Sequence, residues 1–269
     1  MSTAHLRIVT INILNDLSQW EARRELLAQG LADVQPDLIA LQEVNLPTEN
    51  SAWLAGQLGM QHRYITPKSG PESQSEGIAI LSRLPIQAAQ SLVLPGPQGR
   101  VAQCVEVLAG EIPVYFANGH FFWQPGESET RDRQVEMLLS WIKDISGSYP
   151  TIICGDFNAT PETGAIQSMY RHFRSAYLTM HGREPAFTCP TPLKRTLKSR
   201  LITLRSYLVY LRPQHINPFW RGTLDYIFVG SSIRVNACEL ILNRPAEHHP
   251  SLYPSDHFGL YADLTPGAL

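Results

Sequence analysis

The chain has 269 residues, of which 43% are hydrophobic and 17% are charged. This composition supports a sizeable core and argues against disorder, and the length fits one large α/β domain. The net charge of −2 argues neither for nor against a nucleic-acid partner. No apolar run reaches the roughly 18 residues of a transmembrane helix, and the first residues lack the pattern of a signal peptide. We therefore expect a cytoplasmic location.

The predicted elements alternate between strands and helices along the chain. Apolar runs predict strands at 6–11, 37–41, 77–81, 101–107, 114–117, 151–154, 223–229, 234–242 and 258–264. Helical spacing predicts helices at 20–34, 51–58 and 128–145, the first with a capping box formed by Ser18 and Glu21. This order indicates an α/β fold with mixed sheets in a single domain over residues 1–269.

The four cysteines lie far apart and form no CxxC pair (Cys104, Cys154, Cys189 and Cys238). We therefore expect neither a disulfide framework nor a structural zinc site.

Polar motifs stand at the ends of these apolar runs and supply the candidate site. They are Asn12 in TIN, Gln42-Glu43 in ALQEV, His120 in ANGHFF, Asp156 and Asn158 in ICGDFN, Asp225 in TLDYIF, and Asp256-His257 in PSDHFG. Strand ends converge in an open α/β core, so residues from most of the chain can meet in one pocket. Such a set of carboxylates, imidazoles and amides suits metal-assisted hydrolysis of a phosphate ester.

Two carboxylates are the preferred metal ligands. Glu43 follows four apolar residues and a glutamine and has no basic sequence neighbour. Mg²⁺ takes oxygen ligands and is commonly held by one or two protein carboxylates beside substrate phosphate and water. Glu43 is therefore the first choice and Asp256 the second.

The GDFN segment is the strongest single motif, although Gly, Asp and Asn all favour plain turns as well. In a functional site, Asp156 is suited to orient or deprotonate the attacking water. Asn158 is neutral and is suited to hydrogen-bond a phosphoryl oxygen or the nucleophile.

Each of the two candidate histidines needs an orienting partner. Asp225 lies in an apolar strand, where a buried carboxylate is costly unless it is paired, and His257 would satisfy it. Glu76 is the possible partner of His120, or else a plain exposed carboxylate. The remaining histidines have no motif around them.

The ordered set of motifs resembles the endonuclease/exonuclease/phosphatase superfamily of metal-dependent phosphodiesterases and nucleases. The match runs from Asn12 to His257, and EGIAILSRLPI is similar to a strand and turn of the family. Two positions depart from it: Thr223 stands where many members have Arg, and Gly119 where Thr or Cys is common.

The resemblance implies a four-layer sandwich of two mixed β-sheets packed face to face and flanked by helices. It also implies Mg²⁺ or Mn²⁺ bound by Glu43, with Asn12 and Asp256 near the metal. Asp156 and Asn158 would position water and phosphate, and His257, oriented by Asp225, would stabilise the phosphorane or act in acid–base catalysis. His120 matches a second histidine found in some branches and favours these over the apurinic-endonuclease branch.

The substrate class is left open among several phosphate esters. A nucleic acid or nucleotide end is preferred, with a phospholipid or sphingomyelin head group, or an inositol polyphosphate, as alternatives. A non-catalytic phosphate-binding member is the alternative from another class, although intact Glu43, Asp156 and His257 argue against it.

A basic amphipathic insertion at about 190–221 is the main clue to a partner. Residues 194–221 contain seven basic and no acidic residues, which leaves 15 basic and 24 acidic residues elsewhere. Leucines recur there at helical spacing. The segment is read as a basic arm for nucleic acid, as a helix on an anionic membrane surface, or as a helix packed on the body.

Overall fold

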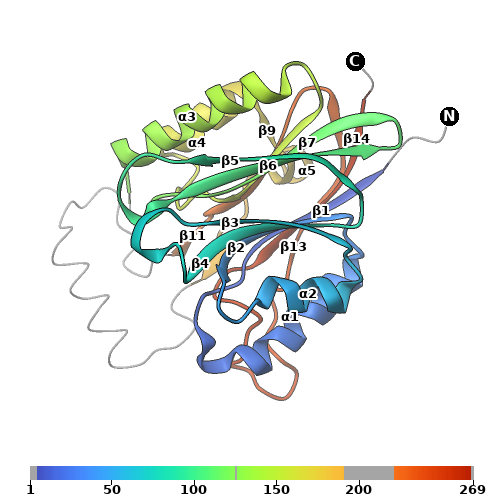
Figure 1. Cartoon of the computed structure of the whole chain (residues 1–269), viewed down its shortest axis with the longest axis vertical. Helices are drawn as coiled ribbons and strands as arrows, with labels where there is room; N and C mark the ends of the chain where they lie inside the picture. Colours follow the sequence, from blue (N-terminus) through green and yellow to red (C-terminus); the bar gives the residue numbers. More distant parts are fainter. Residues whose placement is uncertain (1–4, 125, 191–220, 268–269) are drawn as a thin grey trace.

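The computed structural model describes residues 5–124, 126–190 and 221–267, and within them two six-stranded mixed sheets dominate (Figure 1). The first sheet has the order β13 (Ile233–Ile241), β14 (Gly259–Pro266), β1 (Leu6–Asn12), β2 (Leu38–Asn45), β4 (Glu76–Ser82) and β3 (His62–Pro67). The second has the order β5 (Ile86–Val93), β6 (Val101–Ala109), β7 (Ile112–His120), β8 (Thr151–Asp156), β12 (Asp225–Val229) and β9 (Arg174–Ser175). A short ribbon pairs β10 (Cys189–Pro190) with β11 (Arg221–Gly222).

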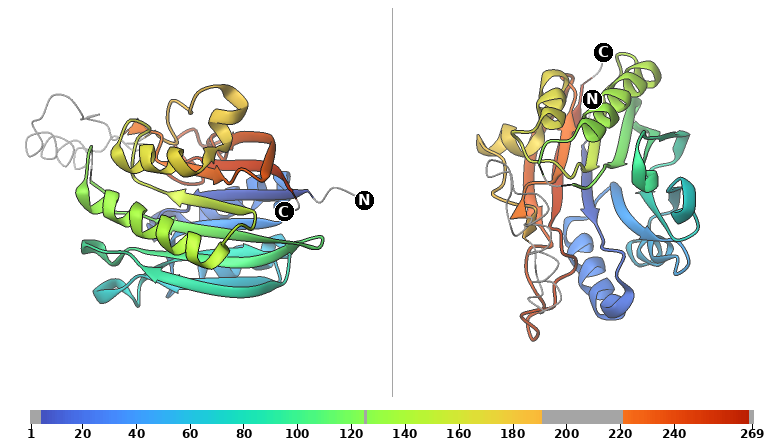
Figure 2. Two further views of the ribbon diagram at one scale, coloured as in Figure 1. Left: turned by 90° about the horizontal axis from the view of Figure 1, so that it is seen from above. Right: turned by 90° about the vertical axis from the view of Figure 1, so that its left-hand side faces the viewer.

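The sheets pack face to face, and helices cover their outer faces. Helices α1 (Trp20–Val34) and α2 (Asn50–Leu58) lie against the first sheet, and α3 (Glu129–Ser146) and α4 (Gly164–His172) lie against the second (Figures 1 and 2). Helix α5 (Ala176–His181) contacts β12 and β13. The four-layer α/β sandwich expected from the resemblance is thus confirmed.

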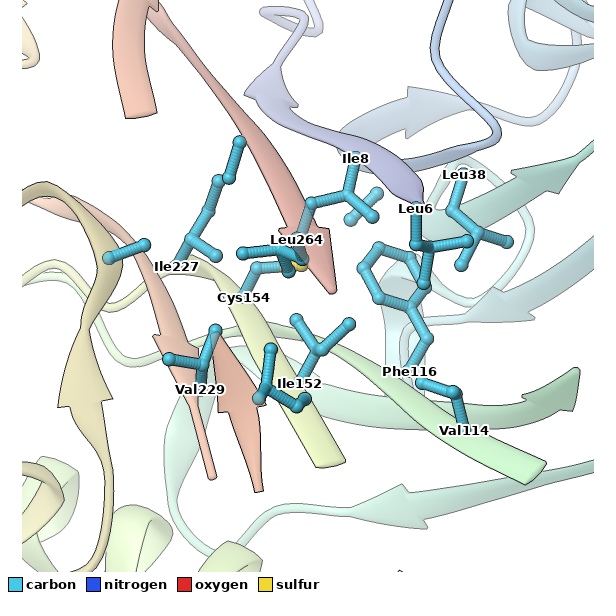
Figure 3. Packing of buried hydrophobic residues seen from close by; sticks show 14 of the residues in the cluster. Leu6, Ile8, Leu38, Val114, Phe116, Ile152, Cys154, Ile227, Val229 and Leu264 are labelled. Carbon is cyan, nitrogen blue, oxygen red and sulfur yellow. The ribbon is translucent and has the colours of Figure 1, made fainter. Parts of the chain in front are cut away.

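The central core lies between the two sheets and is built by the alternation of strand side chains. Leu6 and Ile8 of β1 meet Phe116 of β7 and Ile152 and Cys154 of β8 in one buried cluster (Figure 3). Because successive strand side chains point to opposite faces, the intervening residues pack outward under the helices. A side chain on the inner face at the end of a strand therefore points toward the other sheet.

The predicted elements are largely present, but several details differ. The Ser18–Glu21 capping box is wrong: Ser18 lies in a 3₁₀ turn at Leu17–Gln19 that the Asp16 carboxylate caps, and no side chain caps α1. Strands β3 and β5 and helices α4 and α5 were not predicted. The leucine pattern within the basic insertion lies outside the described residues.

All four cysteines are buried, and the described part of the chain contains no disulfide bond. None of the described helices is long and apolar enough to cross a membrane.

Candidate active site

Inward-facing rows of side chains end in polar residues at one edge of the sandwich. On β1 the row Leu6, Ile8 and Thr10 ends at Asn12, and on β8 the row Ile152 and Cys154 ends at Asp156. The same alternation places His120 at the end of β7 and Asp225 at the start of the antiparallel β12. The period of two therefore carries four site residues from the core to the same rim.

Asp156 is the centre of the site and joins the two sheets. Its Oδ2 atom accepts a hydrogen bond from Asn12 Nδ2 at 3.1 Å, and its Oδ1 atom accepts from the backbone N–H of Asn158 at 2.9 Å. Oδ2 also lies 3.5 Å from His120 Nε2 and 3.9 Å from His257 Nε2. The carboxylate is thus surrounded by two imidazoles and an amide, and only 1% of the residue is exposed.

Glu43 reaches the site through an irregularity in β2. Strict alternation would turn Glu43 away from the second sheet, because Gln42 points inward and donates to Asn118 Oδ1 at 2.7 Å. The register to β4 shifts between Leu41 and Val44, and Glu43 has a φ of 57°. This bulge re-aims the carboxylate, which then accepts hydrogen bonds from Asn12 Nδ2 (3.1 Å) and the Asn15 N–H (2.9 Å). Gln42 and Glu43 accordingly lie within β2 and do not follow it.

The loop that carries Asp256 is tied to the end of β1. Ser255 Oγ donates to the carbonyl of Asn12 at 2.6 Å. Arg23 of α1, which is 4% exposed, donates to the carbonyls of Ile13 (2.8 Å) and Pro254 (3.0 Å). These bonds hold the loop of Asp256 beside Asn12.

His257 and Asp225 form the predicted pair. His257 Nδ1 lies 2.8 Å from Asp225 Oδ2, and both residues are buried. Thr188 Oγ1 donates to the same Oδ2 atom at 2.5 Å and accepts from the Asp225 N–H at 3.1 Å. Thr188 therefore fixes the Asp225 carboxylate, which in turn orients His257. Thr188 has no motif around it in the sequence and was not predicted.

His120 contacts Arg100, and the predicted partnership with Glu76 is wrong. Arg100 Nη1 lies 2.7 Å from the His120 ring nitrogens, and both side chains are buried. Glu76 instead accepts from Asn15 Nδ2 (3.1 Å) and pairs with Lys68 (2.7 Å). It therefore supports Glu43 through Asn15. The proximity of Arg100 to the site follows from a hairpin loop that the sequence pattern did not resolve.

The GDFN turn is built by a close approach of β7 and β8. Gly155 has a φ of 138°, and a Cβ atom there would lie 2.0 Å from the carbonyl oxygen of Gly119. Asn158 follows with a φ of 49° and donates from Nδ2 to the Phe121 carbonyl at 3.2 Å. At Gly119 itself a Cβ atom would lie 2.6 Å from the Phe121 ring, so glycine there makes room for that ring.

The second departure from the family pattern, Thr223, has a local role. It is buried and donates a hydrogen bond from its hydroxyl to the carbonyl of Pro185. Thr223 thus anchors the chain just before Asp225.

Electrostatics give the two histidines opposite preferences. Burial and the positive charge of Arg100 hold the pKa of His120 well below its usual value, which favours the neutral ring. Burial opposes the charged form of His257 too, but the carboxylates of Asp225 and Asp156 outweigh it and raise the pKa of this group well above its usual value. Burial, together with the charge of Asp225, raises the pKa of Asp156 to about 7. The site thus holds a candidate base next to a candidate acid.

The acidic groups at this rim fit a divalent cation by their chemistry. Asp156, Asp225 and His257 offer ligand atoms within 4.8 Å of one another, but the His257–Asp225 hydrogen bond already accounts for that grouping. Glu43 and Asp256 are better suited. In the described part of the chain neither has a lysine or arginine nitrogen within 4 Å, and each keeps a carboxylate at the rim that is only partly buried.

Curated relatives match the chain over most of its length. Nocturnin from Xenopus laevis is 25% identical over 281 residues, which span 92% of this chain and 65% of the relative. The 2′,5′-phosphodiesterase 12 of Mus musculus is 30% identical over 166 residues, which span 55% of this chain and 25% of the relative. The chain thus spans less than two thirds of the length of these relatives.

Solved structures share the fold. A D. rerio TDP2 complexed with a single-strand DNA product superposes with a TM-score of 0.76 at 18% identity, covering 97% of this chain and 99% of that one. The human nocturnin catalytic domain with a bound sulfate anion gives 0.73 at 24% identity, covering 98% and 94%.

The model of the Endonuclease/Exonuclease/phosphatase family matches residues 9–257. This stretch holds nearly all of the chain and every site residue from Asn12 to His257, so the protein belongs to the Endonuclease/Exonuclease/phosphatase family.

Proposed function

We propose that this protein is a metal-dependent phosphodiesterase that acts on a nucleic acid or nucleotide end. The single observation that carries the proposal is the surrounding of Asp156, whose carboxylate lies among Asn12, His120 and His257 at the rim where both sheets meet. The names of the relatives support the substrate class, since one is a 2′,5′-phosphodiesterase and one solved neighbour holds a single-strand DNA product.

The proposed metal is Mg²⁺ or Mn²⁺, held by Glu43, Asn12 and Asp256. Oxygen ligands of this kind suit a hard cation. When bound, the cation supplies positive charge that stabilises the charge developing on the phosphoryl oxygens. Asn15 donates to both Glu43 and Glu76, so Glu76 and Asn15 help to orient the Glu43 carboxylate.

The protein's own groups supply the proton transfers. Asp156 Oδ2 is the proposed base: it takes a proton from the water that attacks phosphorus. His257, charged at neutral pH through Asp225, is the proposed acid: its Nε2 gives a proton to the leaving oxygen as the P–O bond breaks. Water thus gives OH to phosphorus, and the leaving alcohol gains a proton from His257. The proton that Asp156 took from the water then returns to His257 through solvent, which restores both groups.

Two further groups stabilise the charge on phosphorus. The Arg100 guanidinium lies beside His120 and is drawn toward the charges of Asp156, Glu76 and Glu43. An arginine keeps its charge even when burial lowers its pKa, so Arg100 offers a fixed cation for a phosphoryl oxygen. Asn158 uses its backbone N–H to hold Asp156 Oδ1, and its amide is the proposed contact to phosphate.

Hydrolysis of a substrate panel in Mg²⁺ tests this proposal. The panel contains single-stranded and duplex DNA, RNA, a 2′,5′-linked oligonucleotide, a 5′-tyrosyl DNA end, sphingomyelin vesicles and an inositol polyphosphate. We expect cleavage of a nucleic-acid substrate that EDTA, Asp156→Asn or His257→Ala abolishes.

The matched control is His172→Ala, which alters an exposed histidine at the end of α4 and is expected to retain activity. Full activity in both site variants would overturn the residue assignment. Cleavage confined to sphingomyelin or inositol phosphate would overturn the substrate class.

A further inference from the structure

Trp123 is a large apolar side chain left exposed beside the candidate active site. It lies three residues after His120, in the segment that leaves β7, and 51% of it is exposed. Consecutive Cα atoms are about 3.8 Å apart, which keeps its Cα within about 11 Å of that of His120. Phe121 and Phe122, just before it, are buried. Packing of the core explains these two rings but not the exposed indole.

The backbone on either side of Trp123 is held rigidly by α3. Gln134 Oε1 accepts from the N–H of Phe122 at 2.8 Å. Arg131, which is 1% exposed, donates from Nη1 to the carbonyls of Phe122 (3.1 Å) and Gln124 (2.9 Å). A buried arginine thus brackets Trp123 from both sides. The backbone position from which the indole projects is therefore set before any ligand arrives.

The Gln98 side chain connects the backbone of Trp123 to the guanidinium of Arg100. Gln98 Oε1 accepts from the backbone N–H of Trp123 at 3.2 Å and from Arg100 Nε at 3.2 Å. Arg100 in turn contacts His120. The Trp123 backbone and the Arg100 guanidinium are therefore held by the same side chain. The guanidinium contacts His120 of the site, and 51% of Trp123 is exposed to solvent beside it.

We propose that Trp123 is a stacking platform for a nucleobase next to the scissile phosphate, an inference that rests on the function proposed above. Aromatic side chains next to a cationic groove bind single-stranded nucleic acid because every base has a π-face. A rigid indole loses little conformational entropy on binding. Stacking of this kind tolerates any base, so Trp123 selects unpaired, base-bearing ends and not a sequence.

The test compares two single-stranded oligodeoxynucleotides of equal length, one with all its bases and one abasic throughout. We expect Trp123→Ala to lower kcat/KM on the base-bearing oligomer about tenfold, mostly through KM, which corresponds to about 1.4 kcal/mol. The same variant should leave kcat/KM on the abasic oligomer unchanged. Trp123→Phe keeps an aromatic face and should retain most of the activity.

Tyr149→Ala is the matched control, because Tyr149 is 43% exposed and precedes β8 at the end opposite Asp156. It should behave as wild type on both oligomers. A binding readout complements the kinetics: in EDTA, an uncleavable phosphorothioate oligomer should quench tryptophan fluorescence in the wild type and much less in Trp123→Phe.

An equal loss on both oligomers in Trp123→Ala, or no loss on either, would overturn the stacking role while leaving the proposed function intact. Failure of the wild type to cleave either oligomer in a His257-dependent way would overturn the proposed function and this inference together.

Discussion

Asn12 and Asp156 are 144 residues apart in the sequence and are joined by a 3.1 Å hydrogen bond that crosses from one sheet to the other. The same Asn12 amide nitrogen also donates to Glu43 at 3.1 Å. Asn12 therefore sets the spacing between the proposed metal ligand and the proposed base. Hydrogen bonds to charged groups are among the stronger ones in proteins, so this bridge is expected to matter for both geometry and activity.

Replacing Asn12 by Ala removes this bridge. We expect kcat/KM to fall about 10- to 100-fold, which is typical of lost support around a metal site. Steady-state kinetics of Asn12→Ala on the preferred substrate measures the loss. Asn236→Ala, which changes a partly buried asparagine on β13 that hydrogen-bonds Asp263, is the control for general loss of an amide. Equal kinetics in both variants would contradict the bridging role.

Removing the hydroxyl of Thr188 should loosen Asp225. Thr188→Val keeps the shape of the side chain but loses the 2.5 Å hydrogen bond to Asp225 Oδ2. We expect kcat to fall about tenfold with little change in KM, since Thr188 is fully buried and acts through Asp225. Thr188→Ser restores the hydroxyl and should recover most of the rate. If Ser and Val variants are equally impaired, the hydroxyl is not what matters.

Glu43→Gln should weaken the binding of metal. The substitution keeps a hydrogen-bond acceptor for Asn12 but removes the charge that holds the cation. The Mg²⁺ concentration for half-maximal activity should rise more than about tenfold, and calorimetric titration of Mg²⁺ should show the same weakening. Glu49→Gln changes an exposed glutamate before α2 and should leave both values unchanged. Identical titrations for Glu43→Gln and wild type would remove Glu43 from the ligand set.

The pH dependence of activity should respond to metal. Burial raises the pKa of Asp156 to about 7, so the proposed base is protonated below that pH and activity should rise as pH increases through it. A cation bound nearby favours the carboxylate and lowers its pKa. The acid limb of the pH–rate profile should therefore move to lower pH as Mg²⁺ is increased from limiting to saturating. If the midpoint of the acid limb stays at the same pH at every Mg²⁺ concentration, Asp156 is not the base.

Several residues that the sequence proposes for the site obey the period of two. Asn12, Asp156 and Asp225 each end or begin an inward-facing apolar row, so pattern and position agree. The resemblance added the identity of the set and the sandwich fold. Strands β3 and β5 lie at sheet edges and were missed for a physical reason: only Thr66 of β3 and no residue of β5 is buried, so neither has a buried face to impose alternation.

The rest depends on tertiary contacts that no local pattern encodes. Glu43 reaches the site through a bulge, and the sequence gives no signal of its register shift. The sequence suggests Glu76 as the partner of His120, but in the fold His120 contacts Arg100, which follows the Pro/Gly loop between β5 and β6. Thr188 looks like any loop threonine until the strand of Asp225 lies beside it. These are pairings set by packing, not by propensity.

The division of the site between two sheets has a wider consequence. Glu43 and Asn12 stand on one sheet, and His120, Asp156 and Asp225 stand on the other, with apolar side chains as the layer between them. The separation of the reacting groups is therefore fixed by how thick that apolar layer is. A larger or smaller side chain between the sheets would change the distance between them, and with it the distance between the site residues at the rim. Catalytic geometry in this protein is thus a property of its interior as much as of the residues that touch substrate.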